Sequence, residues 1–465
     1  MVLTTTANMS ETEQRASFSG KMGFILASSA AAVGLGNLWR FPYETSHYGG
    51  GIFVLVYVIL AFSFGVCLMM VETAIGRKTG KSCISAFGDL CKKYRFIGYL
   101  GAIVPLLITP YYCVIGGWVT KWFFETSIGN LNMLADNNGE YWGNFIAGVT
   151  DGGFLTPSFW FLIFAFLCLI CVIAGVDRGI EKMSKILMPV LLIMILCIIG
   201  YEMTLDGFWD GVVYYLNPDI SCLSKDTFLG AASQIFYSMS IAMGILITYG
   251  SYTKKEVDLE QSAFSVGAVD TIMALLAGLL IIPAAMMCGF EDSNGMGLMF
   301  VALPQVFTMM PGGTLIAPIF YLLVLFAALT SAVSLSEACA SIIHDGCKVN
   351  RLRSTSLTAV VILIFGMICV LGFGNGPLAW GNPLDQNAGW LGFFDTVSNS
   401  ILMPIVCILT CVFIGYVVKT TVLEDEIAIS SPFRTRKLFR IMVMYVCPIL
   451  LSIIFVAWAY GLIVG

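Results

Sequence analysis

Residues 30–43, AAAVGLGNLWRFPY, place polar and helix-breaking residues inside a long apolar run. Gly34 and Gly36 weaken a continuous helix, because a glycine in a helix interior costs about 1 kcal/mol relative to alanine. Asn37, Arg40 and a proline follow closely. An interrupted membrane helix leaves backbone polar groups without partners in the helix, so it must face something polar rather than lipid. The stretch therefore indicates a binding site at membrane depth rather than a lipid-facing helix.

A second apolar run, residues 228–252, carries Ser238, Ser240 and Gly244 in mid-span. Serine and glycine can simply permit close helix packing, and for this run alone that alternative stays open. Interrupted segments at corresponding positions of two halves of a chain, however, are typical of inverted-repeat transporters with a midplane site. The next apolar run contains Asp270. A carboxylate at membrane depth is costly without a partner, so we expect a bound cation beside it.

The elements that position these residues are predicted to be membrane-spanning helices. Hydrophobic residues make up 58% of the chain and charged residues only 11%, and the mean hydropathy is +0.88. Such a composition lies outside the range of soluble domains. The runs lack the two-residue alternation of barrel strands, so helices are the expected spanning element. Eleven runs are long enough to span a membrane: 22–45, 49–76, 97–126, 158–176, 184–204, 228–252, 263–289, 314–343, 356–373, 391–418 and 440–464.

Lysine and arginine residues alternate between loops in a way that predicts the orientation. They are concentrated before the first run and after every second run, whereas the other loops carry mostly acidic residues. Because basic residues are enriched in cytoplasmic loops, we expect a cytoplasmic N-terminus and an extracytoplasmic C-terminus in the plasma (inner) membrane. The expected organisation is a cytoplasmic segment 1–21, five-helix repeats 22–204 and 228–418, and an eleventh helix 440–465.

Several motifs together resemble the neurotransmitter:sodium symporter family, the LeuT-fold amino-acid and amine transporters. They are GLGNLWRFPY (34–43), GGG (49–51), ETAIGR (72–77), SQIFYSMS (233–240), ALTSAVSL (328–335) and FFDTVSNSILMP (393–404). The resemblance extends over essentially the whole chain. It implies an all-α LeuT fold, with a 5+5 inverted repeat, broken first and sixth helices and eleven helices. It also implies Na+-coupled symport by alternating access.

The resemblance implies two sodium sites. The first would comprise the Ala32 carbonyl, Asn37, Ser238 and Asp270. The second would comprise the carbonyls of Ala30, Val33 and Ala327 with the hydroxyls of Thr330 and Ser331. An intramembrane serine or threonine more often bonds its own helix backbone, which is the alternative for each hydroxyl. The convergence of four segments on one set of motifs favours ligation.

Asp270 departs from the family pattern, which commonly has asparagine at that position. In chloride-dependent relatives a serine four residues further on helps to hold the anion, but this chain has Ala274. The remaining chloride positions match Tyr57, Gln234 and Ser238. We interpret Asp270 as replacing the charge of chloride. This predicts chloride-independent transport, with proton binding to Asp270 as a candidate step when sodium leaves. A carboxylate that serves only helix packing is the alternative.

The expected substrate is a neutral, hydrophobic α-amino acid. Gly34 stands where monoamine carriers have an aspartate, so room is left for a substrate carboxylate near the first Na+, the Gly36 amide and the Tyr112 hydroxyl. The ammonium group would meet Ser240 and carbonyls of the two breaks, and Ala32 and Ser238 are also expected to bind the substrate. The side chain would lie among Ile108, Tyr237, Met243, Ser331 and Leu335. This lining leaves the choice between aliphatic and aromatic substrates open, and Tyr111 is expected only to pack.

The resemblance also implies two gates and a helix that unwinds. The outer gate would be Arg40 with Asp395, together with Tyr112 and Tyr237 as an aromatic lid. The inner gate would be Arg15 with Asp345, and Tyr252 and Gln234 would be supporting polar groups at the two faces. Phe18 stands where relatives usually have tryptophan, which predicts a weaker inner latch. Gly179 and Pro189 have the spacing that allows the cytoplasmic half of the fifth helix to unwind, although a simple kink is the alternative.

Other functional classes fit the residues less well. A channel would more often repeat a pore motif around an oligomer axis. An enzyme would need a nucleophile with a base or a metal cluster, and the two histidines lie near opposite faces. A transporter-fold sensor without net transport is the main alternative. We expect a monomer or weak homodimer surrounded by membrane lipid, with a small-molecule substrate and no nucleic-acid partner.

Overall fold

The computed structural model describes residues 17–135, 139–149, 152–287, 289, 295–374, 376–381 and 389–464. This part of the chain is almost entirely helical and contains no strand. The helices of the first half are α1 (Lys21–Ala32), η1 (Gly36–Arg40), α2 (Phe41–His47), α3 (Gly51–Leu60), η2 (Ala61–Gly65), α4 (Val66–Thr79), α5 (Cys83–Leu90), η3 (Lys92–Tyr94), α6 (Arg95–Ser127), α7 (Leu131–Leu134), α8 (Glu140–Ile146), α9 (Leu155–Ile173), η4 (Val176–Glu181) and α10 (Lys182–Glu202).

The second half continues with shorter connecting helices and long apolar ones. They are α11 (Phe208–Leu216), η5 (Ile220–Cys222), α12 (Lys225–Ser238), α13 (Ile245–Ser251), α14 (Leu259–Met287), α15 (Gly295–Gly297), η6 (Leu298–Ala302), α16 (Leu303–Met309), α17 (Gly313–Cys347), α18 (Arg351–Leu371), α19 (Gly389–Asp395), η7 (Thr396–Leu402), α20 (Met403–Val412), η8 (Phe413–Lys419), α21 (Thr421–Ile427), α22 (Arg436–Ile441), η9 (Met442–Val446) and α23 (Cys447–Val464).

Nine helical stretches in the described part of the chain are long and apolar enough to cross a membrane. A tenth is a bent pair, Lys21–Ala32 with Gly36–His47, whose halves meet at 51°. The predicted run 228–252 corresponds to α12 and α13, which are too short to span a membrane separately. The helical fold is thus confirmed, whereas the count of eleven spans and the bounds of the two repeats stay predictions.

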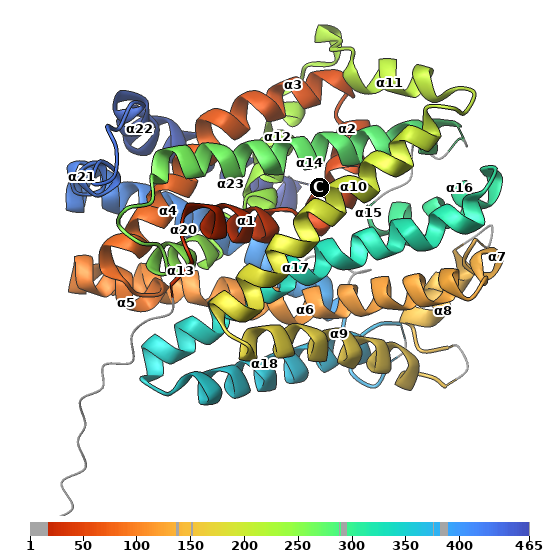
Figure 1. The fold of residues 1–465 in the computed structure, drawn as a ribbon, viewed down its shortest axis with the longest axis horizontal. Helices are drawn as coiled ribbons and strands as arrows, with labels where there is room; N and C mark the ends of the chain where they lie inside the picture. The colour runs from red at the N-terminus through yellow and green to blue at the C-terminus, as the bar shows by residue number, and fades with distance from the viewer. Residues whose placement is uncertain are drawn as a thin grey trace, which may run out of the picture.

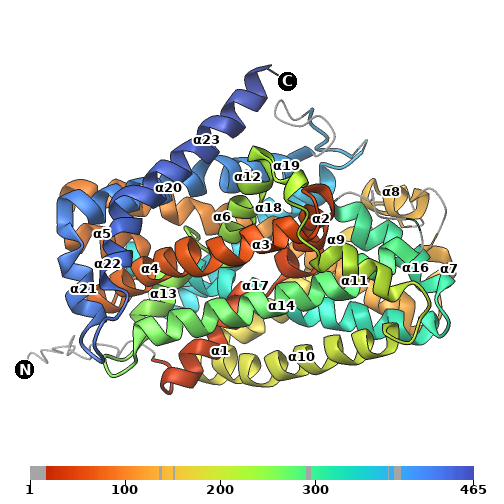
Figure 2. The same ribbon diagram turned by 90° about the horizontal axis from the view of Figure 1, so that it is seen from above.

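Packing brings the two interrupted segments to the middle of the molecule. The long helices α6 and α17 run against each other, and α9 and α18 cover α6 along one edge (Figure 1). The short helix α1 packs on both α14 and α17, while α13 packs on α4. In Figure 2, α10 runs along one edge, and α23 slopes away from the opposite side toward the C-terminus. The chain breaks are therefore enclosed by protein, as irregular backbone at membrane depth requires.

The two breaks have different backbone conformations. At the first, Val33 adopts an extended conformation with ψ of 99° before the chain resumes as η1. At the second, Ser240, Ala242 and Gly244 have φ angles of 54°, 62° and 71°. Positive φ is unfavourable for residues other than glycine, and such strain concentrates at functional sites. The surrounding packing must therefore hold Ser240 and Ala242 in place.

Candidate functional site

Asp270 on α14 lies at the centre of a buried polar cluster. The Asn37 side-chain amide donates to one carboxylate oxygen at 2.8 Å, and the Ser238 hydroxyl lies 2.8 Å from each oxygen. The Tyr57 hydroxyl of α3 donates to the other oxygen at 3.3 Å. All four side chains are at most 1% exposed. The three side chains predicted for the first sodium site thus meet, and they supply only amide, hydroxyl and carboxylate oxygens as ligands.

The residues predicted for the second sodium site also meet, where α1 ends against α17. The Ser331 hydroxyl lies 3.4 Å from the Ala30 carbonyl oxygen and 3.2 Å from that of Val33. The Thr330 hydroxyl lies 3.0 Å from the Ala327 carbonyl oxygen. These are hard oxygen donors around an interrupted helix, which is the donor set that Na+ prefers. Thr330 also donates a hydrogen bond to the Phe326 carbonyl within its own helix. Its contacts are therefore compatible with both interpretations of this hydroxyl, namely Na+ ligation and bonding to its own helix backbone.

A small cavity lies between these two clusters. Its volume is about 20 Å³, which accommodates roughly one water molecule. Ten of the eleven residues predicted to bind substrate line it, and Ser238 bonds Asp270 instead. Ala31 and Ile245 complete the lining and were missed, because neither carries a polar or motif signal. The lining is Ala31, Ala32, Gly34, Gly36, Ile108, Tyr112, Tyr237, Ser240, Met243, Ile245, Ser331 and Leu335.

The glycines of the first break allow aromatic side chains to approach the backbone. A Cβ atom on Gly36 would lie 2.6 Å from the Tyr237 ring, and one on Gly34 would lie 2.8 Å from the Tyr112 hydroxyl. The Tyr112 hydroxyl accepts a hydrogen bond from the Leu35 amide at 3.2 Å. The Tyr112 hydroxyl is thereby held against the backbone of the first break, at the wall of the cavity.

Glu72 on α4 supports the second break. Its carboxylate accepts a hydrogen bond from the Ala242 amide at 2.6 Å, and the side chain is 5% exposed. The Ser240 hydroxyl reaches across to the Ala31 carbonyl at 3.1 Å. Both positive-φ residues are therefore fixed by hydrogen bonds. We assigned no role to Glu72 from sequence, although a carboxylate within an apolar run was an available signal.

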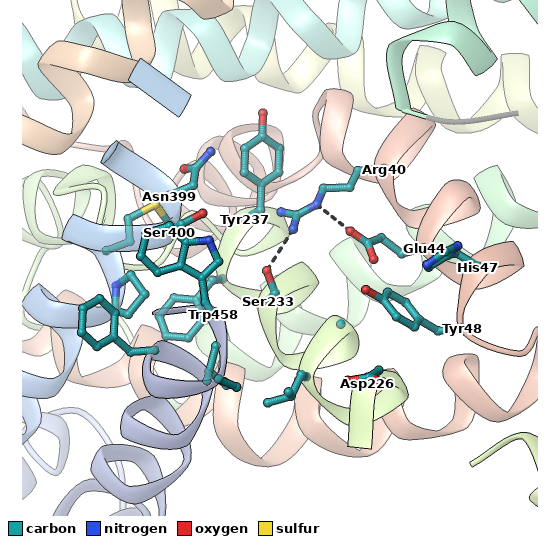
Figure 3. Close-up of a pocket in the computed structure, with 18 of the residues that line it drawn as sticks. Arg40, Glu44, His47, Tyr48, Asp226, Ser233, Tyr237, Asn399, Ser400 and Trp458 are labelled. Atoms are coloured by element: carbon teal, nitrogen blue, oxygen red, sulfur yellow. Dashed lines mark hydrogen bonds and ion pairs between the residues drawn. The ribbon is translucent and has the colours of Figure 1, made fainter. Parts of the chain in front are cut away.

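The outer face of the site contains a larger cavity of about 760 Å³. Arg40 and Tyr237, labelled in Figure 3, line it together with Asp395. Arg40 forms an ion pair with Glu44 at 3.1 Å, donates to the Ser233 hydroxyl at 2.9 Å, and stacks 5.3 Å above the Tyr237 ring. The predicted pair of Arg40 with Asp395 is absent from the ion pairs of the described residues. It stays a prediction for another conformation.

Asp395 has different partners from the one predicted. It accepts hydrogen bonds from Tyr111 at 2.9 Å and from Asn399 at 2.5 Å. The expectation that Tyr111 only packs was therefore wrong. A tyrosine hydroxyl at membrane depth needs an acceptor, and the acceptor came from a helix nearly 300 positions later in the chain. Sequence spacing could not reveal that contact.

The inner face contains a network of polar and aromatic groups. Arg15 lies outside the described residues, so its pairing with Asp345 stays a prediction, while Asp345 accepts from the Ser82 amide at 2.6 Å. Phe18 is buried and meets Tyr252 edge-on, with ring centroids 6.1 Å apart. The Tyr252 hydroxyl donates to Glu337 at 2.7 Å, and that carboxylate also binds Arg351 at 2.8 Å. Gln234 lies by the first break and donates to the Gly36 carbonyl at 3.0 Å.

The predicted unwinding segment contains an irregular helix. Gly179 belongs to the π-helix η4, and Pro189 lies within α10. Between them, Glu181 accepts from the Ser19 amide at 2.9 Å and pairs with Lys185 at 2.6 Å. This carboxylate ties the N-terminal segment to the fifth helix. Sequence reasoning missed it, because Glu181 looks like an ordinary residue at a helix end.

Comparison with known proteins agrees with this geometry. The model of the sodium:neurotransmitter symporter family matches residues 15–142 and 135–462. The chain belongs to the sodium:neurotransmitter symporter family. The resemblance noted from the motifs is thereby confirmed, and the protein is a Na+-coupled, multi-pass membrane transporter of this family rather than a member of an enzyme family.

Several relatives match almost the full chain. An uncharacterised sodium-dependent transporter of Haemophilus influenzae is 30% identical, over 96% of this chain and 98% of its own length. A sodium-dependent transporter of Bacillus subtilis, YhdH, is 32% identical over 89% of this chain and 90% of its own length. The crystal structure of the LeuT-fold transporter MhsT in complex with L-phenylalanine has a TM-score of 0.83 and 32% identity, covering 95% of this chain and 99% of MhsT.

Proposed function

We propose that this protein imports a neutral, hydrophobic α-amino acid together with Na+, by alternating access and without a requirement for chloride. The observation that carries the proposal is the buried cluster of Asn37, Ser238 and Asp270 beside a cavity lined by uncharged residues. The buried cluster supports binding of a cation beside a carboxylate. The uncharged cavity lining supports a neutral substrate.

Two sodium sites are proposed, one on each side of the cavity. Na+ at the Asp270 cluster would replace the hydrogen bonds that Asn37 and Ser238 now donate, because their oxygen atoms would turn toward the ion. Na+ at the other site would take the carbonyl oxygens that the Ser331 hydroxyl now contacts. Sodium binding and the geometry of both helix breaks would therefore be coupled directly.

Chloride independence is supported by where the hydroxyl donors point. Tyr57 and Ser238 occupy positions that hold chloride in chloride-dependent relatives, but here both donate to Asp270. Ala274, one turn further along α14, offers no hydroxyl. A chloride ion about 4 Å from this carboxylate would be repelled by roughly 4 kcal/mol at an effective dielectric constant of about 20. In this proposal the ionised Asp270 carboxylate supplies a negative charge where those relatives bind an anion while Na+ is bound.

The substrate proposal rests on the cavity lining. None of its twelve residues is charged, so a charged substrate side chain would lack a partner. The substrate carboxylate would face the first Na+ and the Tyr112 hydroxyl, and the ammonium group would face Ser240 and the carbonyls of the breaks. MhsT binds L-phenylalanine in its crystal structure, which supports an α-amino acid here. The cavity of about 20 Å³ must widen to admit an amino acid.

Alternating access would use the contacts at the two faces. Outside, Arg40 would exchange Glu44 for Asp395 as the gate closes fully. Inside, release of Ser19 from Glu181 would free the N-terminal segment, and η4 would let the fifth helix unwind. A cytoplasmic N-terminus and a monomeric or weakly dimeric state in lipid complete the proposal.

The test is uptake of radiolabelled neutral amino acids into proteoliposomes, with Na+ or K+ outside. Accumulation above the external concentration, driven by the Na+ gradient, would support the proposal and name the substrate. Binding of the same amino acid without accumulation would favour a sensor. A preference for charged amino acids would contradict the substrate assignment.

A further inference from the structure

Glu202 is a buried carboxyl group that the sodium and substrate sites do not use. It is the last residue of α10 and is 0% exposed. Neither carboxylate oxygen has a hydrogen-bond partner. Every other buried carboxyl group among the described residues has at least one hydrogen bond or ion pair: Glu44, Glu72, Glu181, Glu260, Asp270, Glu337, Glu424 and Glu426.

The position of Glu202 explains why it lacks partners. It continues the apolar buried face of α10, one turn beyond Ile198 and Ile199. The neighbouring Tyr201 hydroxyl donates to the Pro311 carbonyl, which sets this end of α10 against the turn before α17. A Cβ atom on Gly207 would lie 3.4 Å from Met287, which brings the end of α14 to the same place. Glu202 thus lies near the junction of three helix ends.

Titratable groups on the elements that pack against α10 lie elsewhere. On α14, Asp270 is 17 positions before Met287, or about 26 Å along the axis. On α17, Tyr321 donates to the Met299 carbonyl, and Glu337, His344 and Asp345 lie about 36 Å or more from the helix start. Lys21 of α1 and the charged residues of η4 belong to the opposite end of α10. Among the described residues, no charged side chain forms a hydrogen bond with either Glu202 oxygen.

An ionised carboxylate in this setting would be strongly destabilised. Desolvating a charge without donors or a counter-ion costs several kcal/mol. The carbonyl end of a helix adds to that cost, because its dipole repels negative charge. A protonated carboxyl group carries no charge and fits the same space. The arrangement is therefore compatible with one protonation state only.

We propose that Glu202 is a proton-binding site, occupied while the junction of α10, α14 and α17 is packed (the closed form) and emptied when water enters this junction (the open form). Gly207 and Gly312, which precede α11 and α17, have φ angles of 88° and 69°. Glycine at both turns lets the flanking backbone change conformation at low cost. One proton is thus linked to the conformational equilibrium, at a place separate from Asp270. This inference rests on the proposed transport function for its second consequence, a pH response of the transport cycle.

The first test detects the proton directly and does not require transport. Infrared difference spectroscopy of the purified full-length protein separates the carbonyl stretch of a protonated carboxyl group from the bands of carboxylates. We expect the spectrum of the wild type minus that of Glu202→Gln to contain the protonated band at neutral pH. Glu202→Met, of similar volume, gives the same comparison if the glutamine variant does not fold. Absence of the band from both comparisons would overturn the proposal.

The second test measures the pH profile of Na+-driven uptake between about pH 6 and about pH 8.5. One linked proton changes the closed-to-open equilibrium by at most about tenfold per pH unit, with the closed form favoured at low pH. Glu202→Gln should transport with a flattened profile, since it mimics the protonated form. Asp206→Asn, an exposed carboxyl change four residues away, should keep the wild-type profile. A wild-type profile in Glu202→Gln would refute the linkage. Failure of the transport proposal would appear instead as no Na+-driven uptake by the wild type at any pH, with the infrared band still present.

Discussion

Substitution of Gly34 by alanine would perturb the proposed substrate site, the Tyr112 hydroxyl and the second sodium site at the same time. The added methyl group would lie 2.8 Å from the Tyr112 hydroxyl oxygen and would also press on the Ser331 hydroxyl. Favourable contacts of carbon begin at about 3.5 Å, so the tyrosine would have to retreat by about 0.7 Å. Overpacking of this kind typically costs about 1 to 3 kcal/mol. That range corresponds to an approximately 5- to 160-fold loss of affinity.

The assay is equilibrium binding of a radiolabelled neutral amino acid, such as L-phenylalanine, at a series of Na+ concentrations. We expect Gly34→Ala to weaken both substrate binding and its Na+ dependence, because Ser331 also contacts carbonyls of the second sodium site. Gly200→Ala is the matched control, since Gly200 lies on α10 with open space at its Cβ position. Wild-type substrate and Na+ affinities in Gly34→Ala would refute the proposed position of the substrate.

Three further predictions follow from individual contacts. Tyr111→Phe should lower the uptake rate, because the buried hydrogen bond to Asp395 is worth about 1 to 3 kcal/mol; uptake at the wild-type rate would mean that the bond serves packing alone. Glu72→Gln should weaken substrate binding, because the amide of Ala242, a residue with positive φ, would lose its charged acceptor. Unchanged binding would show that the second break keeps its conformation without this carboxylate. Burial raises the pKa of Glu424, but hydrogen bonds from two arginines, Arg440 and Arg436, bring it down to about 2. Because this pKa lies below 4.5, the usual value for a glutamate, the stabilising effect of ionised Glu424 on α21 is present above that value and is lost as the pH falls toward 2. Hydrogen exchange of α21 can follow this loss, and exchange that is independent of acid would contradict it.

The features that sequence predicted best depend on local chemistry. Apolar run length determines where a membrane helix fits, and all eleven runs correspond to helical segments. Glycine and asparagine at Gly34, Gly36 and Asn37 identified the first break, because few other roles suit such residues at membrane depth. Family motifs then indicated which residues meet around the cavity.

The features that sequence missed depend on the partners that tertiary packing supplies. Tyr111 donates to Asp395, the last residue of α19, and Glu181 accepts a hydrogen bond from Ser19 of the N-terminal segment. Neither pair has a characteristic spacing, since the partners are far apart in the chain. Arg40 is the opposite case. It pairs with Glu44, four residues away, rather than with the distant Asp395 that was predicted as its partner. Contacts that can be exchanged between conformations are the hardest to predict from sequence.

The central claim is that the fixed charge of Asp270 takes the place of chloride in a Na+-driven transporter. The most direct measurement is accumulation of a radiolabelled neutral amino acid in proteoliposomes under a Na+ gradient, with chloride replaced by gluconate on both sides. Accumulation that requires Na+ and is unchanged in gluconate is the predicted result. Accumulation that collapses without chloride would contradict the assignment of Asp270.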